Sequence, residues 1–256
     1  KFAEVVYTLP DEEDYGGETG GRSDLLFWVH SEDIERDGPD QYLSSVSGIV
    51  VPGGFGPRGI EGMIQAARYA REHRVPYLGL CLGMQLMVVE MARAVLSSPD
   101  ANSTEFDKTS GHPVVGLITE WQDASGETEL RTEASDLGGT MRLGAYSCAL
   151  QEGTRAREVY DAEQVSERHR HRFEVNNKYR ELLTQNGMTL SGLSPDGGLV
   201  EMIELSDHPW FIAAQFHPEL KSRPTRPHPL FASFIEAAAQ YAQKKATAPV
   251  EEPVGV

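Results

Sequence analysis

The chain has few basic residues, few cysteines and no long apolar run. Lys and Arg number 23 against 39 Asp and Glu, which gives a formal net charge of −16. We therefore expect neither nucleic acid nor an anionic membrane as a partner, because phosphate contacts need an excess of basic residues. No stretch approaches the roughly 20 apolar residues that a membrane span needs. The N-terminus, Lys1–Phe2–Ala3–Glu4, lacks the apolar core of a signal peptide.

The two cysteines, Cys81 and Cys148, have neither metal-site spacing nor a disulfide framework. We therefore expect a reducing environment and a cytoplasmic protein. Cys148 has no catalytic setting around it and is interpreted as a small buried residue. The 256 residues also lack an internal repeat or a linker strong enough to divide them. Because the sequence starts at Lys1 and not at Met, it stays open whether another segment precedes it.

Apolar runs and helical periodicity alternate in the first half of the chain. Strands are predicted at 25–29, 48–51 and 76–80, and helices at 60–71 and 82–95. This alternation is typical of parallel strands joined by crossover helices. The runs do not alternate with polar residues, which favours strands buried on both faces. We predict an α/β fold: an open, mostly parallel central sheet, flavodoxin-like at its core, with helices on both faces.

Three regions are expected along the chain. Residues 1–24 form an atypical, loop-rich segment, because Asp, Glu and Gly dominate 11–24. Residues 25–245 form one domain, and residues 246–256, with two Pro and two Glu, form a disordered tail. Further strands are predicted at 5–9, 114–119, 146–150, 188–193, 199–204 and 210–216, and helices at 176–185 and 229–244.

The stretch Gly79–Leu80–Cys81–Leu82–Gly83 places a cysteine where a predicted strand becomes a helix. A G-x-S-x-G turn of this kind displays the nucleophile of hydrolases, and here sulfur replaces oxygen. The helix N-terminus favours the thiolate, and the N–H of Leu82 would point toward an oxyanion beside the sulfur. Taken alone, the pattern fits a small buried cysteine equally well.

A thiol nucleophile needs a base, usually a histidine that a third group orients. The best candidate is His217, which follows the predicted strand 210–216. Glu219 lies two residues further on, so in an extended chain both side chains face the same side. His-x-Glu alone is a weak signal, but both segments end at a sheet edge. Cys81, His217 and Glu219 are therefore our candidate catalytic residues.

A second glycine turn, Pro52–Gly53–Gly54–Phe55–Gly56, follows the predicted strand 48–51. It lacks the spacing of dinucleotide-binding loops, and the chain contains no G-x-x-x-x-G-K-[ST] motif. Nucleotide binding is therefore poorly supported. We interpret the backbone N–H of Gly53 or Gly54 as the second half of an oxyanion site, since the two turns belong to successive strands.

The basic stretch Glu167–Arg168–His169–Arg170–His171–Arg172 stands out in an acidic chain. Two histidines with one residue between them could suggest a metal, but the interleaved arginines repel a cation and no third ligand is near. We predict no metal site. A solvated basic strand and an anion contact by one arginine both stay open.

Several motifs together resemble one family, the class I (triad) glutamine amidotransferase domain of CTP synthases. They are PGGFGPRGIEG (52–62), YLGLCLGMQ (77–85), NSTEFD (102–107), DLGGTMRLG (136–144), SERHRHRFEVNN (166–177) and FHPELKSRPTRPHPLF (216–231). The Cys turn and His-Pro-Glu fit any class I glutaminase, whereas 136–144 and 166–177 indicate CTP synthase. The resemblance covers roughly residues 25–245.

The resemblance implies that Cys81 is the nucleophile, His217 the base and then the acid, and Glu219 its orienting group. Glutamine would be hydrolysed through a γ-glutamyl thioester, and the ammonia would aminate UTP to CTP in pyrimidine nucleotide biosynthesis. Gly54 and Leu82 would hold the oxyanion. The residues implied in glutamine binding are Gly54, Phe55, Leu82, Gly83, Met84, Gln85, Glu105 and Arg172. Of these, Glu105 would meet the α-ammonium group and Arg172 the α-carboxylate.

The family also implies a partner that this chain lacks. An amidoligase (synthase) domain binds ATP, UTP and Mg²⁺ there, and full-length enzymes form homotetramers mainly through it. We therefore expect no cofactor in this domain, which alone could act at most as a glutamine hydrolase. The family opens with a strand and an amphipathic helix, and residues 1–24 match this pattern only weakly. Either a segment is missing or one face of the sheet is uncovered, with apolar surface exposed.

Two other interpretations stay open. The first is a γ-glutamyl hydrolase or another class I glutaminase with the same three residues, acting without an ammonia acceptor. The second is a regulatory module in which the three residues are present but not organised for catalysis.

Overall fold

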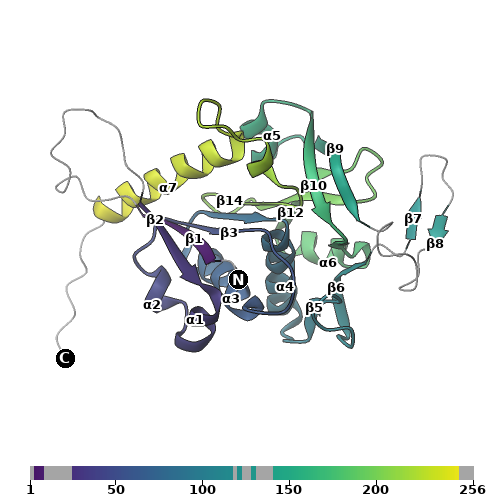
Figure 1. The fold of residues 1–256 in the computed structure, drawn as a ribbon, viewed down its shortest axis with the longest axis horizontal. Helices are drawn as coiled ribbons and strands as arrows, with labels where there is room; N and C mark the ends of the chain where they lie inside the picture. The colour runs from purple at the N-terminus through teal and green to yellow at the C-terminus, as the bar shows by residue number, and fades with distance from the viewer. Residues whose placement is uncertain (1–2, 9–24, 118–119, 123–127, 131–140, 248–256) are drawn as a thin grey trace.

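The computed structural model describes residues 3–8, 25–117, 120–122, 128–130 and 141–247. Its centre is a nine-stranded sheet in the order β10-β9-β12-β13-β14-β4-β3-β1-β2 (Figure 1). The strands are β1 (Ala3–Thr8), β2 (Leu25–His30), β3 (Gly48–Val51), β4 (Tyr77–Leu80), β9 (Arg142–Leu150), β10 (Gln164–His171), β12 (Met188–Leu193), β13 (Val200–Leu205) and β14 (Phe211–Ala214).

Helices cover both faces of this sheet, as an α/β fold requires (Figure 1). They are α1 (Ser31–Asp37), α2 (Asp40–Leu43), α3 (Ile60–His73), α4 (Leu82–Leu96), α5 (Arg155–Tyr160), α6 (Arg180–Gln185) and α7 (Pro229–Thr247), with short 3₁₀ turns η1 (Asn177–Tyr179) and η2 (Pro218–Leu220). Successive residues of a strand point to opposite faces. Ile49 and Val51 accordingly pack in a core with α3 and α4, whereas Val50 packs in a second core with Phe234 of α7.

The expectation of a mostly parallel sheet is wrong, although the α/β fold and the helices on both faces are confirmed. Among the strands that the structure describes, only β3–β4 and β4–β14 pair in parallel within the central sheet. The other neighbours in this sheet pair antiparallel. A parallel pair needs a crossover of a dozen or more residues. The segment around α3 and α4 provides such crossovers, whereas β12, β13 and β14 are joined by the short connections 194–199 and 206–210.

Two smaller sheets lie outside the central one. The first, in the order β11-β6-β5, joins β5 (Ala101–Ser103), β6 (His112–Leu117) and β11 (Phe173–Val175), and β5 and β6 contact α4. The second pairs β7 (Glu120–Gln122) with β8 (Thr128–Leu130). The first of these sheets places residues 105 and 172 at one edge, as described below.

Most predicted elements are present with bounds shifted by a few residues. The helices predicted at 60–71, 82–95 and 229–244 are α3, α4 and α7, and the short strand near residue 5 is β1, which pairs with β2 and β3. The helices α1, α2 and α5 were not predicted, since short polar segments with one or two buried residues carry little periodicity. Helix α7 includes residues 246–247 of the predicted tail. The loop at 11–24 and residues 248–256 lie outside the described residues.

The edge strand β2 exposes apolar side chains. Leu26, Phe27 and Trp28 are 41%, 48% and 64% exposed. Successive residues of a strand point to opposite faces, so these exposed side chains lie on both faces of β2.

Candidate active site

Cys81 lies in a sharp turn between β4 and α4. Its backbone has φ 51° and ψ −100°, a conformation that residues with a side chain rarely adopt. Glycines on both sides make the turn possible. A Cβ on Gly83 would lie 2.1 Å from the carbonyl oxygen of Val51, and one on Gly79 would lie 2.9 Å from the backbone of Gly83. The turn therefore holds the cysteine at the carboxyl edge of β4 by close backbone packing.

The first turn of α4 leaves two backbone donors beside the cysteine. The N–H of Cys81 donates to the carbonyl of Ala214 at 2.7 Å, and its carbonyl accepts from Met84 and Gln85. In the described part of the chain, the N–H groups of Leu82 and Gly83 have no acceptor. These donors lie at the positive end of a 15-residue helix, which favours negative charge at this position.

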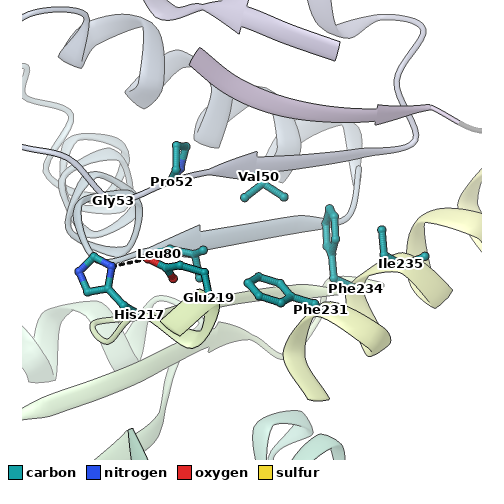
Figure 2. A pocket seen from close by; sticks show the side chains of 9 residues that line it. All are labelled: Val50, Pro52, Gly53, Leu80, His217, Glu219, Phe231, Phe234 and Ile235. Atoms are coloured by element: carbon teal, nitrogen blue, oxygen red, sulfur yellow. Dashed lines mark hydrogen bonds and ion pairs between the residues drawn. The ribbon is translucent and has the colours of Figure 1, made fainter. Parts of the chain in front are cut away.

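His217 and Glu219 follow the carboxyl end of β14, the parallel neighbour of β4. This pairing brings them to the same sheet edge as Cys81. The Nδ1 atom of His217 lies 2.6 Å from Oε1 of Glu219. A dashed line marks this hydrogen bond in Figure 2. The backbone N–H of His217 donates to the carbonyl of Arg168 at 2.8 Å. This contact with β10 fixes the backbone that carries the imidazole. Its Nε2 atom is buried and has no hydrogen-bond partner in the described structure.

The electrostatics of His217 favour its protonated form. Burial alone would lower its pKa, but the nearness of Cys81 and the hydrogen bond to Glu219 more than reverse this and raise the pKa to about 10. An imidazolium beside the sulfur and an unpaired Nε2–H are what a group needs to donate a proton to a leaving amine. The predicted pair of His217 and Glu219 is thus assembled beside Cys81.

The glycine turn after β3 closes over these residues. A Cβ on Gly53 would lie 2.8 Å from Cε1 of His217 and 3.4 Å from Cβ of Cys81. A Cβ on Gly54 would lie 3.1 Å from the side chain of Leu82. Gly53 therefore lies against both the cysteine and the imidazole, and Gly54 lies next to the start of α4. The neighbouring turns predicted from the sequence do meet.

Glu105 and Arg172 lie at one edge of the small sheet. Glu105 follows β5, Arg172 precedes β11, and the carboxyl end of β6 lies between the two strands. Oε1 of Glu105 accepts from the N–H of Gly56 at 2.9 Å, which ties it to the glycine turn. Burial raises the pKa of Glu105, and this hydrogen bond opposes the rise. Among the described residues, the guanidinium of Arg172 has no hydrogen bond or ion pair, so it is free for a ligand.

The side chains of several predicted binding residues are buried or already paired within the protein. The side chain of Met84 is fully buried in the core, and that of Leu82 is nearly so. The side-chain amide of Gln85 donates to the carbonyl of Phe173 and to Oε1 of Gln215. The side chain of Phe55 is 71% exposed. Gln215, which sequence reasoning missed, is fully buried with its amide nitrogen 3.7 Å from the Cys81 sulfur. The sequence pattern that could have indicated Gln215 is a single polar residue at the end of an apolar strand.

The basic stretch forms a two-sided strand. Arg168 and Arg170 lie on one face of β10, and Glu167, His169 and His171 are buried on the other. Burial, together with the charge of Arg142, lowers the pKa of His169 and that of His171. The interpretation as a solvated strand is therefore right for one face only. No group of three or more His, Cys, Asp or Glu side chains that could hold a metal ion occurs within the described ranges.

A cavity of about 280 Å³ opens beside the His217–Glu219 pair. Figure 2 shows Phe231 and Phe234 of α7 on one side of it and Gly53 at its edge. Glu105 and Arg172 do not line it, so the predicted glutamine contacts lie elsewhere. The second cysteine, Cys148, is fully buried, and burial raises its pKa, which agrees with a structural role.

Comparison with known proteins identifies the architecture. The family model described as "Glutamine amidotransferase class-I" matches residues 15–237. The chain belongs to the class I glutamine amidotransferase family. The amidotransferase is similar to the glutaminase domain of the CTP synthase of Trypanosoma brucei, solved with bound acivicin, with 38% identity, a TM-score of 0.74, and coverage of 84% of this chain and 80% of that one.

A second solved structure shares the fold of this amidotransferase. It comes from Thermoplasma acidophilum and is described as a component of a GMP synthase, with 17% identity, a TM-score of 0.50, and coverage of 85% of this chain and 81% of that one. In the part of the amidotransferase that the structure describes, no helix has the length and apolar character needed to cross a membrane.

Proposed function

We propose that this domain hydrolyses L-glutamine to glutamate and ammonia through a γ-glutamyl thioester on Cys81. The observation that carries the proposal is the meeting of two separate segments, which carry three polar side chains, at one sheet edge. Cys81 lies at the strained turn before α4, His217 follows the parallel neighbour strand, and Glu219 holds the imidazole at 2.6 Å. A thiol, a base and an orienting carboxylate in this arrangement form a nucleophilic triad.

The thiolate of Cys81 attacks the side-chain amide carbon of glutamine and forms a C–S bond. The amide oxygen becomes an oxyanion, for which the backbone N–H groups of Gly54 and Leu82 are the proposed donors. His217 then gives its proton to the amide nitrogen, and the C–N bond breaks to release ammonia. Water attacks the thioester as His217 takes up one of its protons. Glutamate leaves, and the thiolate–imidazolium pair is restored.

The substrate contacts that we propose include one acidic and one basic side chain. Glu105 meets the α-ammonium group, and Arg172, which is free of protein partners in the described structure, meets the α-carboxylate. The half-buried position of Glu105 supports this role, because a buried carboxylate gains from a cation. Phe55 flanks the substrate, and the remaining proposed contacts are made by Leu82, Gly83, Met84 and Gln85.

The product ammonia is proposed to aminate UTP to CTP on a synthase domain of the same enzyme. The likeness to the Trypanosoma CTP synthase domain supports this part of the proposal. In that arrangement ATP, UTP and Mg²⁺ bind to the synthase domain, this domain needs no cofactor, and the full-length enzyme is a cytoplasmic homotetramer.

Glutamate and ammonia release from L-glutamine tests the proposal. We expect both products in equal amounts from the wild-type chain and from Cys148→Ala, the matched cysteine control. Cys81→Ala should release neither. A glutamine-derived electrophile should modify Cys81 alone, as mass spectrometry of the digested protein would show. If γ-glutamyl peptides are hydrolysed and glutamine is not, the domain is a γ-glutamyl hydrolase. If Cys81 is unmodified and nothing is hydrolysed, the isolated domain is not an organised glutaminase.

A further inference from the structure

Two buried amide side chains link the nucleophile to the segment that follows Arg172. Gln215 is completely buried and Gln85 is 3% exposed. The amide nitrogen of Gln85 lies 2.9 Å from the carbonyl oxygen of Phe173 and 3.1 Å from Oε1 of Gln215. The amide nitrogen of Gln215 lies 3.7 Å from Sγ of Cys81. The contacts form one continuous chain from the backbone beside Arg172 to the sulfur.

The orientation of both amides follows from donors and acceptors. The carbonyl of Phe173 can only accept, so the Gln85 atom facing it must be the NH₂ group. The same NH₂ group faces Gln215, which must therefore present its oxygen. The NH₂ group of Gln215 is left on the side of Cys81. A reversed Gln215 would place two NH₂ groups against each other and an amide oxygen against a thiolate, and both contacts are repulsive in a buried site.

We propose that Gln215 is a further residue of the catalytic apparatus, whose side-chain amide donates to the Cys81 sulfur and favours the thiolate. This inference rests on the proposed function, because it takes Cys81 as the nucleophile. A hydrogen bond to a charged group is worth more than one to a neutral group, so the amide stabilises the thiolate over the thiol. Through Gln85 it also fixes the sulfur relative to the segment that carries Arg172.

The charges around the sulfur are consistent with this role. The imidazolium of His217, with Glu219 behind it, provides the positive charge beside the sulfur. His169 and His171 on β10 are buried and held neutral. The buried Arg142 is neutralised by Glu174 and Glu201. Gln215 thus adds a polar donor to the sulfur that these charged groups do not supply.

The pH dependence of Cys81 alkylation by iodoacetamide tests the inference. In a Cys148→Ala background Cys81 is the single cysteine, so alkylation reports its thiolate alone. Gln215→Met keeps a similar volume without a donor. We expect the midpoint of the alkylation curve to shift upward by about one pH unit, with the same plateau at high pH. The control Ile212→Val, a fully buried change in the preceding strand, should leave the midpoint in place. A structural defect would lower the plateau and leave the midpoint unchanged, and that result would overturn the inference.

A second measurement avoids substitution at Gln215. When NMR spectra of the Cys148→Ala protein are recorded against pH, the side-chain amide resonances of Gln215 should shift at the same pH as the midpoint of Cys81 alkylation. Resonances that stay constant across that midpoint would overturn the inference. Neither experiment needs glutamine. A protein that shows both shifts and still hydrolyses no glutamine would refute the proposed function and leave only the hydrogen bond from Gln215 to the Cys81 sulfur standing.

Discussion

Gly83 packs against Val51 so closely that a Cβ on the glycine would lie 2.1 Å from the carbonyl oxygen of the valine. This contact presses the first turn of α4 onto the end of β3. It brings the turn that carries Cys81 against the turn that carries Gly53 and Gly54. The distance between Cys81 and the backbone of Gly54 therefore depends on the absence of a Cβ at residue 83.

The substitution Gly83→Ala should damage both fold and activity. A new Cβ against a backbone atom must push α4 away from β3, at a cost of about 1–3 kcal/mol of unfolding free energy. Glutamine hydrolysis should fall by about 100-fold, since the oxyanion donors move. Chemical denaturation and glutamate release measure the two effects. Gly116→Ala is the control, because its Cβ would make only an ordinary 3.6 Å contact with Thr104. Equal behaviour of the two variants would contradict the packing argument.

The substitution Glu219→Gln should lower activity and make it more sensitive to alkaline pH. The carboxylate helps to raise the pKa of His217, so its loss lowers the pH at which the imidazolium loses its proton. We expect glutamine hydrolysis to fall by about 100-fold at neutral pH. Imidazole resonances followed against pH should show the lower midpoint. An unchanged midpoint for His217 would mean that Glu219 does not set its charge.

The free energy of unfolding should also depend on the protonation of His217. A histidine with a raised pKa stabilises the folded state fully below its unfolded value, about 6.5, and this contribution is lost as pH rises toward the folded value. For His217 the folded value is about 10. His217→Gln should therefore be less stable than the wild type at pH 6, with a difference that shrinks toward pH 10. Urea denaturation at several pH values measures this. A difference that grows with pH would contradict the sign of the shift.

A buried arginine between two carboxylates should be essential for stability. Arg142 donates to Glu174 at 3.0 Å and to Glu201 at 2.8 Å, and all three side chains are buried. Arg142→Met leaves two buried like charges, which should cost about 3 kcal/mol at pH 8.

The cost of Arg142→Met should depend on pH in a defined direction. Burial raises the pKa of Glu174 and of Glu201, and loss of the arginine raises both further. A carboxyl group with a raised pKa destabilises the fold increasingly as pH rises above its unfolded value, about 4.3. The deficit measured by urea denaturation should therefore be smaller at pH 5 than at pH 8. The double replacement of both glutamates by glutamine in the Arg142→Met chain should recover part of it; no recovery would contradict a charge origin.

Sequence predicts the parts of this site that depend on local chemistry. Cys81 could be predicted as a candidate nucleophile because glycines flank it at a strand-to-helix junction. His217 could be predicted as its base because it follows an apolar strand. The direction of the later strands could not be predicted, since β13 and β14 are buried on both faces and so lack the alternation that is common in antiparallel strands. Gln215 was also missed, because a single polar residue after a strand has meaning only once Gln85 and Cys81 lie beside it. Such contacts join residues more than 100 positions apart, and no local pattern records them.

The central claim is that Cys81 forms a γ-glutamyl thioester. Rapid acid quenching of the wild-type chain with glutamine, followed by mass spectrometry of the digest, measures it most directly. We predict that the peptide with Cys81 gains the mass of glutamine less ammonia, that the adduct is labile to hydroxylamine, and that it forms as fast as ammonia appears. Ammonia release from glutamine with no adduct on Cys81, or undiminished release by Cys81→Ala, would contradict the account.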